Sequence, residues 1–314
     1  MATTPTLTLN TGATMPVVGL GTWKSAPGEV AAAVKAALHA GYRHFDCAEI
    51  YGNEAEVGET LKAAFDEGLV KREELFITSK VFNHHHQDRA ADALRTTLKN
   101  LQLAYLDLYL IHWPIKFEDA VIPQPSRQPD GSPNPLIKAS FEFLDTWKAM
   151  EGLLKEGLVR AIGVSNFTQE QIDQLLADSQ TVPAVNQVEF HPYLVQKELL
   201  DYCTAKGIVL TAYSPLGSSD SYTGKLEGAP SLLKCGVVNG IAAEAGRSPA
   251  QVLIRWAVQK GVVVIPKSVN EERIRANFAV FDFELSADQV ARLDGLNRDH
   301  RFGLGWMPGH FFPL

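Results

Sequence analysis

The fold of this 314-residue chain is indicated first by the stretch Arg43-His44-Phe45-Asp46-Cys47-Ala48-Glu49-Ile50-Tyr51-Gly52-Asn53-Glu54. It opens with a short apolar run and reaches an acid, Asp46, with Tyr51 five residues later. Apolar residues then recur four positions apart from Val57 to Phe65, which is the period of an amphipathic helix. Asp46 and Tyr51 are therefore expected in a strand-to-helix loop, where α/β barrels place their chemistry.

The same alternation of a short apolar run and a helical pattern repeats along the whole chain. Buried parallel strands read as such runs, and we expect eight of them, at 17–20, 43–46, 75–80, 106–111, 159–164, 184–188, 208–213 and 262–265. This pattern predicts an α/β fold, a single (β/α)8 barrel domain over residues 1–314. A doubly wound sheet would carry Gly-x-Gly-x-x-Gly after its first strand, and here the third glycine is missing after Gly19-Leu20-Gly21.

Several segments are expected in addition to the eight strand–helix repeats of the barrel. Residues 7–17 read as an N-terminal hairpin that covers one end. Long loops are expected at about 115–136 and 214–231. Ser286 to Gln289 forms a capping box for an extra C-terminal helix, before an aromatic tail from residue 297.

Composition excludes several classes of partner and location. Hydrophobic residues make up 46% of the chain, enough for a sizeable core, and the net charge of −7 argues against nucleic acid or an acidic membrane as the main partner. No apolar run approaches the ~20 residues that span a bilayer, and the N-terminus does not read as a signal peptide. Three scattered cysteines are interpreted as reduced thiols. We expect a cytoplasmic protein, a monomer or weak dimer.

Four polar residues are predicted to meet at one mouth of the barrel: Asp46, Tyr51, Lys80 and His112. A tyrosine is a poor acid at pH 7, and a lysine ammonium beside it is expected to lower its pKa. A carboxylate would hold that ammonium in place, and a histidine could share the substrate oxygen. Each residue alone has an ordinary structural explanation, so the prediction of an oxygen-protonating site depends on their convergence.

With these residues in view, the chain closely resembles the aldo-keto reductase family, NAD(P)H-dependent carbonyl reductases built on this barrel. The resemblance covers nearly the whole chain. Its motifs are Gly21-Thr22-Trp23, Asp46, Tyr51-Gly52-Asn53-Glu54, Lys80, Leu110-Ile111-His112-Trp113-Pro114, Gly163-Val164-Ser165-Asn166-Phe167, Asn186-Gln187-Val188-Glu189-Phe190-His191-Pro192, Tyr213-Ser214-Pro215-Leu216-Gly217 and Ile265-Pro266-Lys267-Ser268.

The resemblance implies roles for matching residues. Tyr51 would be the general acid, tuned by Lys80 and Asp46, and His112 would orient the carbonyl. The implied cofactor contacts are Gly21, Thr22, Trp23, Asp46, Ser165, Asn166, Gln187, Tyr213, Ser214, Leu216, Ser218, Ile265, Lys267, Ser268, Val269, Asn270, Arg273 and Asn277. Within this set, Ser165, Asn166 and Gln187 would bind the nicotinamide amide, and Tyr213 would stack on its ring.

A preference for NADP(H) over NAD(H) also has a physical argument. Only NADP(H) carries the additional phosphate, and the cations Lys267 and Arg273 follow the last strand, where barrels often bind phosphate. Two solvated surface charges are the alternative explanation. Ala276 stands where many relatives carry a glutamate that contacts adenine.

The substrate pocket is predicted from aromatic and apolar residues at the same mouth: Trp23, Ile50, Phe82, Asn83, Trp113, Phe117 and Trp306. Asn83 resembles an asparagine of pentose-reducing relatives, whereas Ile50 is apolar where some of them carry an acid. This mixture indicates aldehydes in general, extending to small aldoses and ketones, with the tail near residues 307–310 closing the pocket.

Two other classes of function stay open. Some relatives bind the cofactor as regulatory or structural proteins with little turnover, although such a role would not need all four polar residues. A barrel isomerase or hydrolase would need a metal cluster or paired carboxylates that we do not find. The run His84-His85-His86 invites a metal interpretation. Adjacent histidines do not share a helix face as i, i+4 pairs do, however, and no cluster of cysteines or carboxylates joins them, so we expect no metal site.

Overall fold

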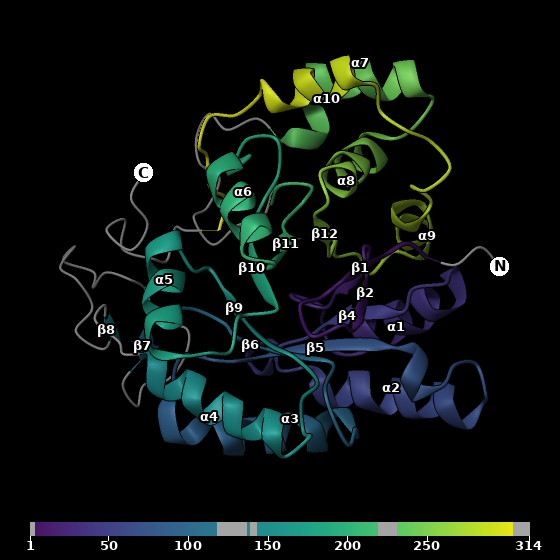
Figure 1. The fold of residues 1–314 in the computed structure, drawn as a ribbon. Coiled ribbons are helices and arrows are strands. Elements are labelled where there is room, and N and C mark those ends of the chain that lie inside the picture. Colours follow the sequence, from purple (N-terminus) through teal and green to yellow (C-terminus); the bar gives the residue numbers. More distant parts are fainter. Residues whose placement is uncertain (1–3, 118–136, 139–142, 219–230, 304–314) are drawn as a thin grey trace, which may run out of the picture.

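The computed structural model describes residues 4–117, 137–138, 143–218 and 231–303 (Figure 1). Its centre is a sheet of eight parallel strands that follow one another in chain order. They are β3 (Leu20–Gly21), β4 (His44–Asp46), β5 (Phe76–Val81), β6 (Leu108–Ile111), β9 (Ile162–Ser165), β10 (Val185–Glu189), β11 (Val209–Tyr213) and β12 (Val263–Val264).

Backbone hydrogen bonds join the first strand region to the last and close the sheet into a barrel. Gly19 N donates to Val264 O at 2.8 Å, and Val264 N donates to Val17 O at 2.9 Å. Beyond them, Gly21 bridges Lys267. Gly21 must lack a side chain here, because a Cβ would lie 2.8 Å from the Ile265 carbonyl oxygen. The predicted barrel is confirmed.

Helices follow the strands and surround them (Figure 1). Eight belong to the repeats: α1 (Glu29–Ala40), α2 (Glu54–Asp66), α3 (Ala90–Leu101), α4 (Phe143–Lys155), α5 (Gln169–Asp178), α6 (Lys197–Ala205), α8 (Pro249–Gln259) and α9 (Glu271–Phe278). Single turns of 3-10 helix occur at η1 (Glu49–Tyr51), η2 (Arg72–Glu74), η3 (Gln87–Arg89) and η4 (Leu232–Lys234). In Figure 1, α2, α3 and α4 lie on one side of the strands, and α7, α8 and α10 lie on the opposite side.

Capping side chains explain where several helices begin. The side-chain oxygens of Thr168, Ser248 and Ser286 each accept a hydrogen bond from the backbone N–H three residues later. The residue at that later position is a glutamine in all three helices, and its side-chain oxygen accepts a hydrogen bond from the backbone N–H of the capping residue. These capping boxes satisfy backbone N–H groups that have no partner inside the helix. The third of them opens α10 (Ala287–Asp294), the expected extra C-terminal helix.

Two regions differ from the sequence prediction. Helix α7 (Gly236–Ala245) was not predicted, because its N-cap is Cys235, whose side chain makes no capping bond. The predicted long loop at 115–136 begins with β7 (Lys116–Phe117), which pairs antiparallel with β8 (Ile137–Lys138). These three elements lack the strong local signals that mark the repeats.

The predicted N-terminal hairpin closes the end of the barrel where the strands begin, opposite their C-terminal ends. It consists of β1 (Thr6–Thr8) and β2 (Thr14–Pro16), paired antiparallel. Leu9 and Met15 are buried and pack with residues at the start of the strands, including Phe76 and Leu108. This hairpin therefore excludes water from the bottom of the inner core.

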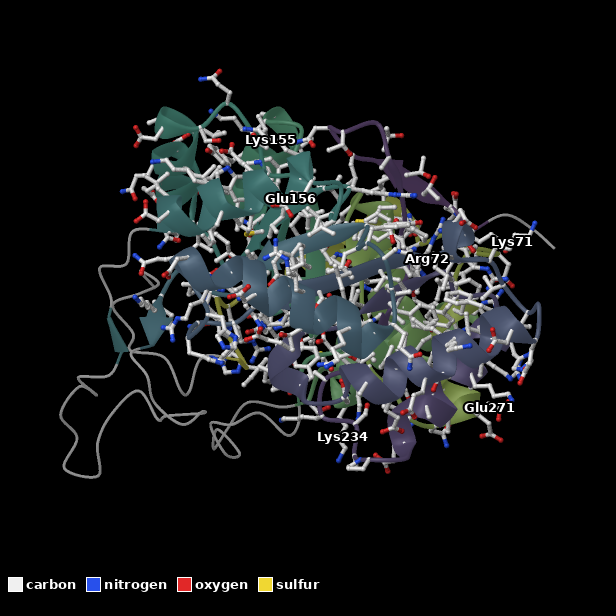
Figure 2. All side chains as sticks on the ribbon, turned by 90° about the horizontal axis from the view of Figure 1, so that it is seen from below. Lys71, Arg72, Lys155, Glu156, Lys234 and Glu271 are labelled. Atoms are coloured by element: carbon white, nitrogen blue, oxygen red, sulfur yellow. The ribbon has the colours of Figure 1, made fainter. Side chains whose placement is uncertain are left out.

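The outer surface of the barrel is charged. Figure 2 draws the described side chains and shows labelled charged residues such as Lys71, Lys155 and Glu271 at the edge of the molecule. No helix in the described part of the chain is long and apolar enough to cross a membrane. Cys47, Cys203 and Cys235 are free thiols.

Candidate active site

The four predicted catalytic residues come from three neighbouring strands. Asp46 is the last residue of β4, and Tyr51 ends the short helix η1 that follows it. Lys80 lies near the end of β5, and His112 directly follows β6. Because the strands are parallel, these residues share the C-terminal face of the barrel.

A buried lysine connects three of these groups. Lys80 Nζ donates to Asp46 Oδ2 at 2.7 Å and to the Cys47 carbonyl oxygen at 2.8 Å. It lies 3.3 Å from the Tyr51 hydroxyl oxygen. The Lys80 and Asp46 side chains are 0% and 2% exposed, so the ammonium and carboxylate neutralise each other away from water.

The expectation that Lys80 lowers the pKa of Tyr51 is wrong for this structure. Burial raises the pKa of Tyr51 well above 10, and the negative charge of Asp46 adds to that effect. The Lys80 ammonium stabilises the Tyr51 phenolate less than expected, because it is already hydrogen-bonded to Asp46 and to the Cys47 carbonyl oxygen. The phenol is consequently protonated throughout the neutral range, as a proton donor requires.

His112 is a neutral imidazole beside the tyrosine. Burial, followed by the charge of Lys80, holds the pKa of His112 well below 6.5. Its ring centroid lies 6.0 Å from that of Tyr51 and 5.4 Å from that of Phe82. Among the described residues, His112 Nδ1 has no hydrogen-bond partner. The two rings can therefore approach one substrate oxygen together.

The residues expected to bind the nicotinamide amide form a hydrogen-bonded chain. The Tyr213 hydroxyl donates to Asn166 Oδ1 at 2.9 Å, and Asn166 Nδ2 donates to Ser165 Oγ at 3.1 Å. Ser165 Oγ donates to the Gln187 carbonyl oxygen, and Gln187 Nε2 donates to Asp46 Oδ1 at 2.8 Å. This chain connects the ends of β9, β10 and β11 to the Asp46 carboxylate.

The residues assigned to the phosphate end lie between β12 and α9. Lys267 is exposed, and its Nζ donates to the Lys24 carbonyl oxygen at 3.0 Å. Asn270 caps α9 by accepting from Arg273 N at 2.9 Å. The Arg273 side chain is exposed and has no ion-pair partner in the described part of the chain, so its guanidinium is available to an anion.

The remaining cofactor positions occupy loops at the same mouth. Thr22 Oγ1 donates to the Asp46 carbonyl oxygen at 2.9 Å, which fixes the loop after β3. Asn277 is buried in α9. The others lie after β3, β11 and β12: Trp23, Ser214, Leu216, Ser218, Ile265, Ser268 and Val269. Because these loops follow parallel strands, they lie at the C-terminal face of the barrel, whereas Asn277 lies in the last turn of α9.

The predicted substrate pocket is partly described. Phe82 and Trp113 are buried, and both rings neighbour His112, whose ring stacks on Trp113 at a centroid distance of 6.4 Å. Ile50 lies in η1, and Trp23 is 36% exposed. Asn83 is fully buried, and neither of its amide atoms has a partner in the described chain. Trp306 and residues 307–310 lie outside the described residues, and the side chain of Phe117 does as well.

Sequence reasoning missed two residues that support the site. Asn53 Nδ2 donates to the Thr22 carbonyl oxygen at 2.9 Å, which ties the loop after η1 to the loop after β3. The Glu54 carboxylate accepts from Ser79 Oγ at 2.6 Å and Thr97 Oγ1 at 3.0 Å. Burial raises the pKa of Glu54. Both belong to the Gly52-Asn53-Glu54 motif, which was the signal available for them.

The histidine run also differs from expectation. No cluster of carboxylates joins it in the sequence, but the fold brings Glu49 of η1 to His84 and His85. His85 Nδ1 lies 3.0 Å from Glu49 Oε1. Burial, with help from His85 and Arg89, lowers the pKa of His84 to about 4. The argument against a metal site from missing carboxylates therefore fails.

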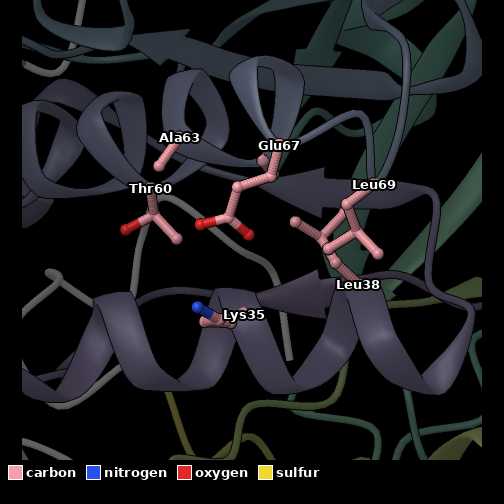
Figure 3. A pocket seen from close by; sticks show the side chains of 7 residues that line it. Lys35, Leu38, Thr60, Ala63, Glu67 and Leu69 are labelled. Atoms are coloured by element: carbon pink, nitrogen blue, oxygen red, sulfur yellow. The ribbon is translucent and has the colours of Figure 1, made fainter.

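A recess on the outer surface is unrelated to this mouth. It lies between α1 and α2 and has a volume of about 40 Å³, far too small for a nucleotide. Figure 3 shows Lys35 of α1 facing Thr60 and Glu67 across it. It is a packing defect between two outer helices.

Comparison with known proteins agrees with the geometry. The model of the aldo/keto reductase family matches residues 17–298. The chain is 51% identical over 302 residues to aldo-keto reductase family 1 member A1 of Mus musculus, covering 96% of this chain and 91% of that protein. The Homo sapiens protein of the same name is 52% identical over 296 residues, covering 94% and 90%.

Solved structures are similar in fold over the whole length. The aldose reductase of Schistosoma japonicum superposes with a TM-score of 0.87 at 43% identity, covering 98% of this chain and 97% of that one. An aldo-keto reductase of Bombyx mori in complex with NADP superposes with a TM-score of 0.84 at 37% identity, covering 96% and 95%.

Proposed function

The chain belongs to the aldo/keto reductase family and is an oxidoreductase that acts on carbonyl groups; from that premise we propose that it reduces aldehydes with Tyr51 as the proton donor. The proposed range extends to small aldoses and ketones. The observation that carries the proposal is the contact of the buried Lys80 ammonium with both Asp46, at 2.7 Å, and the Tyr51 hydroxyl, at 3.3 Å.

Each residue at the mouth of the barrel has a separate role in the proposed carbonyl reduction. Ser165, Asn166 and Gln187 would hold the nicotinamide amide, and the cofactor would supply the hydride for the carbonyl carbon. Tyr51, protonated because burial raises its pKa, donates a proton to the carbonyl oxygen as negative charge develops there. Lys80 is held by Asp46 beside the phenol and stabilises the phenolate that forms. Neutral His112 orients the same oxygen, and Phe82 and Trp113 exclude water around it.

The decisive experiment replaces the proton donor alone. We expect Tyr51→Phe to abolish NADPH-dependent reduction of a small aldehyde such as glyceraldehyde while NADPH affinity changes little, because the ring is kept and only the hydroxyl is lost. General acid catalysis contributes about 10²–10⁴-fold to rate. Retention of more than about a tenth of the wild-type kcat would therefore contradict the role of Tyr51.

A preference for NADP(H) over NAD(H) is part of the proposal. The Bombyx mori relative was solved with NADP. Here the exposed Arg273, in the first turn of α9, makes no ion pair within the part of the chain that the structure describes, and the exposed Lys267 follows β12. A charge-assisted hydrogen bond is worth about 1.5–3 kcal/mol, which corresponds to about one to two decades in affinity.

The matching test is Arg273→Met with fluorescence titration of both cofactors. NADPH affinity should fall at least about tenfold and NADH affinity should hardly change, because only NADPH carries the additional phosphate. Equal loss for both cofactors would show that Arg273 supports the fold of α9 instead. Arg275→Met is a matched control, because that arginine is already paired with Glu271 at 2.7 Å.

We propose further that residues 1–314 act as a single barrel domain, as a monomer or weak dimer. The second candidate function is a cofactor-binding regulatory or structural role with little turnover. It is less favoured because such a role gives no reason for the buried Lys80–Asp46 pair to contact the Tyr51 hydroxyl. An aldehyde panel that shows no loss of NADPH absorbance would favour it.

A further inference from the structure

Three metal-binding side chains meet beside the catalytic mouth, from two loops that are separate in the sequence. Glu49 opens η1, the turn that carries Tyr51, and His84 and His85 lie in the loop after β5. One donor atom from each of the three residues lies within 4.8 Å of the others. We propose that Glu49, His84 and His85 form a binding site for a divalent transition metal ion such as Zn²⁺.

The distances fit a zinc ion. Zn²⁺ binds histidine nitrogen at about 2.0–2.1 Å, so adjacent donors of a tetrahedral site lie about 3.3 Å apart. Here His85 Nδ1 lies 3.0 Å from Glu49 Oε1, and His84 Nε2 lies 3.8 Å from the same oxygen. These separations bracket the ideal value, so small side-chain rotations suffice to accommodate the ion.

The ligand set and its surroundings also favour a metal. Imidazole and carboxylate ligands suit Zn²⁺ and Cu²⁺, and three protein ligands leave one position open for water. The three side chains are between 14% and 38% exposed, so an ion can reach them. The His84 and His85 ring centroids lie 3.8 Å apart, so both imidazoles stand at the same place beside Glu49.

Occupation of this site would connect two segments that shape the active site. Tyr51 lies two residues after Glu49 and ends the same short helix. Phe82 contacts both His84 and His112 through its ring, at centroid distances of 5.8 and 5.4 Å. A bound ion would restrict both segments and add positive charge at the mouth. We therefore expect metal binding to slow turnover, a consequence that rests on the proposed reductase function.

The first test measures binding without reference to activity. Zn²⁺ is titrated by calorimetry into wild type, into His84→Gln with His85→Gln, and into Glu49→Gln. Visible spectra of the Co²⁺-loaded proteins report tetrahedral coordination. We expect one equivalent to bind wild type saturably, and each altered set of ligands to lose at least about tenfold in affinity. His39→Gln and Cys235→Ser are controls, because both residues lie outside the site and offer a competing ligand atom.

Each experimental outcome tests one claim: the metal site, its effect on turnover, or the proposed reductase function. Absence of saturable binding to wild type overturns the proposal, and so does equal affinity in the double histidine variant. Glu49→Gln provides an independent variant if the double variant fails to fold, as judged by circular dichroism. Zinc that binds at this site but leaves kcat unchanged would overturn the regulatory consequence alone. A protein without reductase activity would contradict the proposed function while the binding data still decide the metal site.

Discussion

The buried pair of Lys80 and Asp46 can be tested by a double-mutant cycle. The single variants are Lys80→Met and Asp46→Asn, and the double variant combines them. In either single variant one charged group stays in a site where both side chains are at most 2% exposed. Removal of one partner from a buried ion pair costs about 3–5 kcal/mol, because the remaining charge is no longer compensated. The double variant should recover much of this loss.

The magnitude converts to a measurable shift in melting temperature. With an unfolding entropy of about 2.1 cal/mol/K per residue over 314 residues, 1 kcal/mol corresponds to about 1.5 °C. Each single variant should therefore melt about 5–8 °C below wild type. Lys62→Met is the control, because its pair with Asp66 is 55% and 65% exposed. Exposed pairs contribute about 0.2–1 kcal/mol, so the control should shift by about 1.5 °C or less.

The assay is thermal unfolding by circular dichroism without cofactor, with urea unfolding as a second measure of the free energy. The hydrogen bond from Gln187 to Asp46 remains in the lysine variant, which places its loss toward the lower end of the range. All three variants should also lose reductase activity. Additive shifts in the cycle, or single variants that melt within about 1 °C of wild type, would refute the claim of a buried, mutually compensated pair.

Three further predictions concern pH and packing. The Tyr51 proton donor should not limit the rate of reduction between pH 7 and 9, because its pKa is raised well above 10; a fall in kcat with an apparent pKa near 8, where cofactor release is not limiting, would contradict this. Burial lowers the pKa of His44 to about 4 and of His86 to about 3. The unfolded chain therefore binds more protons below pH 6.5, so the free energy of unfolding should fall by about 2 kcal/mol per histidine from pH 7 to pH 5; urea midpoints that do not change over this range would disprove it. Gly58→Ala should destabilise the packing of α2 on α3 by about 1–3 kcal/mol, because its Cβ would lie 2.3 Å from the Asn100 carbonyl oxygen; Gly152→Ala in α4, where no atom lies within 4 Å, should melt at or above the wild-type temperature.

Patterns among neighbouring residues were sufficient to predict the fold. Alternation of short apolar runs with helical periods predicted the eight strands, and capping boxes at Thr168, Ser248 and Ser286 predicted three helix starts. These signals are strong because each depends on residues within a few positions of one another. Helix α7 was not predicted because it lacks such a local signal: the side chain of Cys235 makes no capping bond that would mark its beginning.

The membership of the site could also be predicted, but not its electrostatics. The parallel order of the strands ensures that Asp46, Lys80 and His112 reach one mouth. The direction of the Tyr51 pKa shift depends on how deeply the phenol is buried and on which other groups form hydrogen bonds with the Lys80 ammonium. Those quantities come from atomic distances across β4, β5 and the turn at η1, and sequence spacing does not contain them.

The barrel, the family and the residues expected at its mouth could be predicted from the sequence, because period, capping and motif order depend on neighbouring residues. The approach of Glu49 to His84 and His85 could not be predicted, because Glu49 lies in a turn 35 residues before His84. The raised pKa of Tyr51 could not be predicted either, because it depends on burial of the phenol in the folded chain. Both results come from contacts between segments that are distant in sequence, whose separations are set only when the barrel closes.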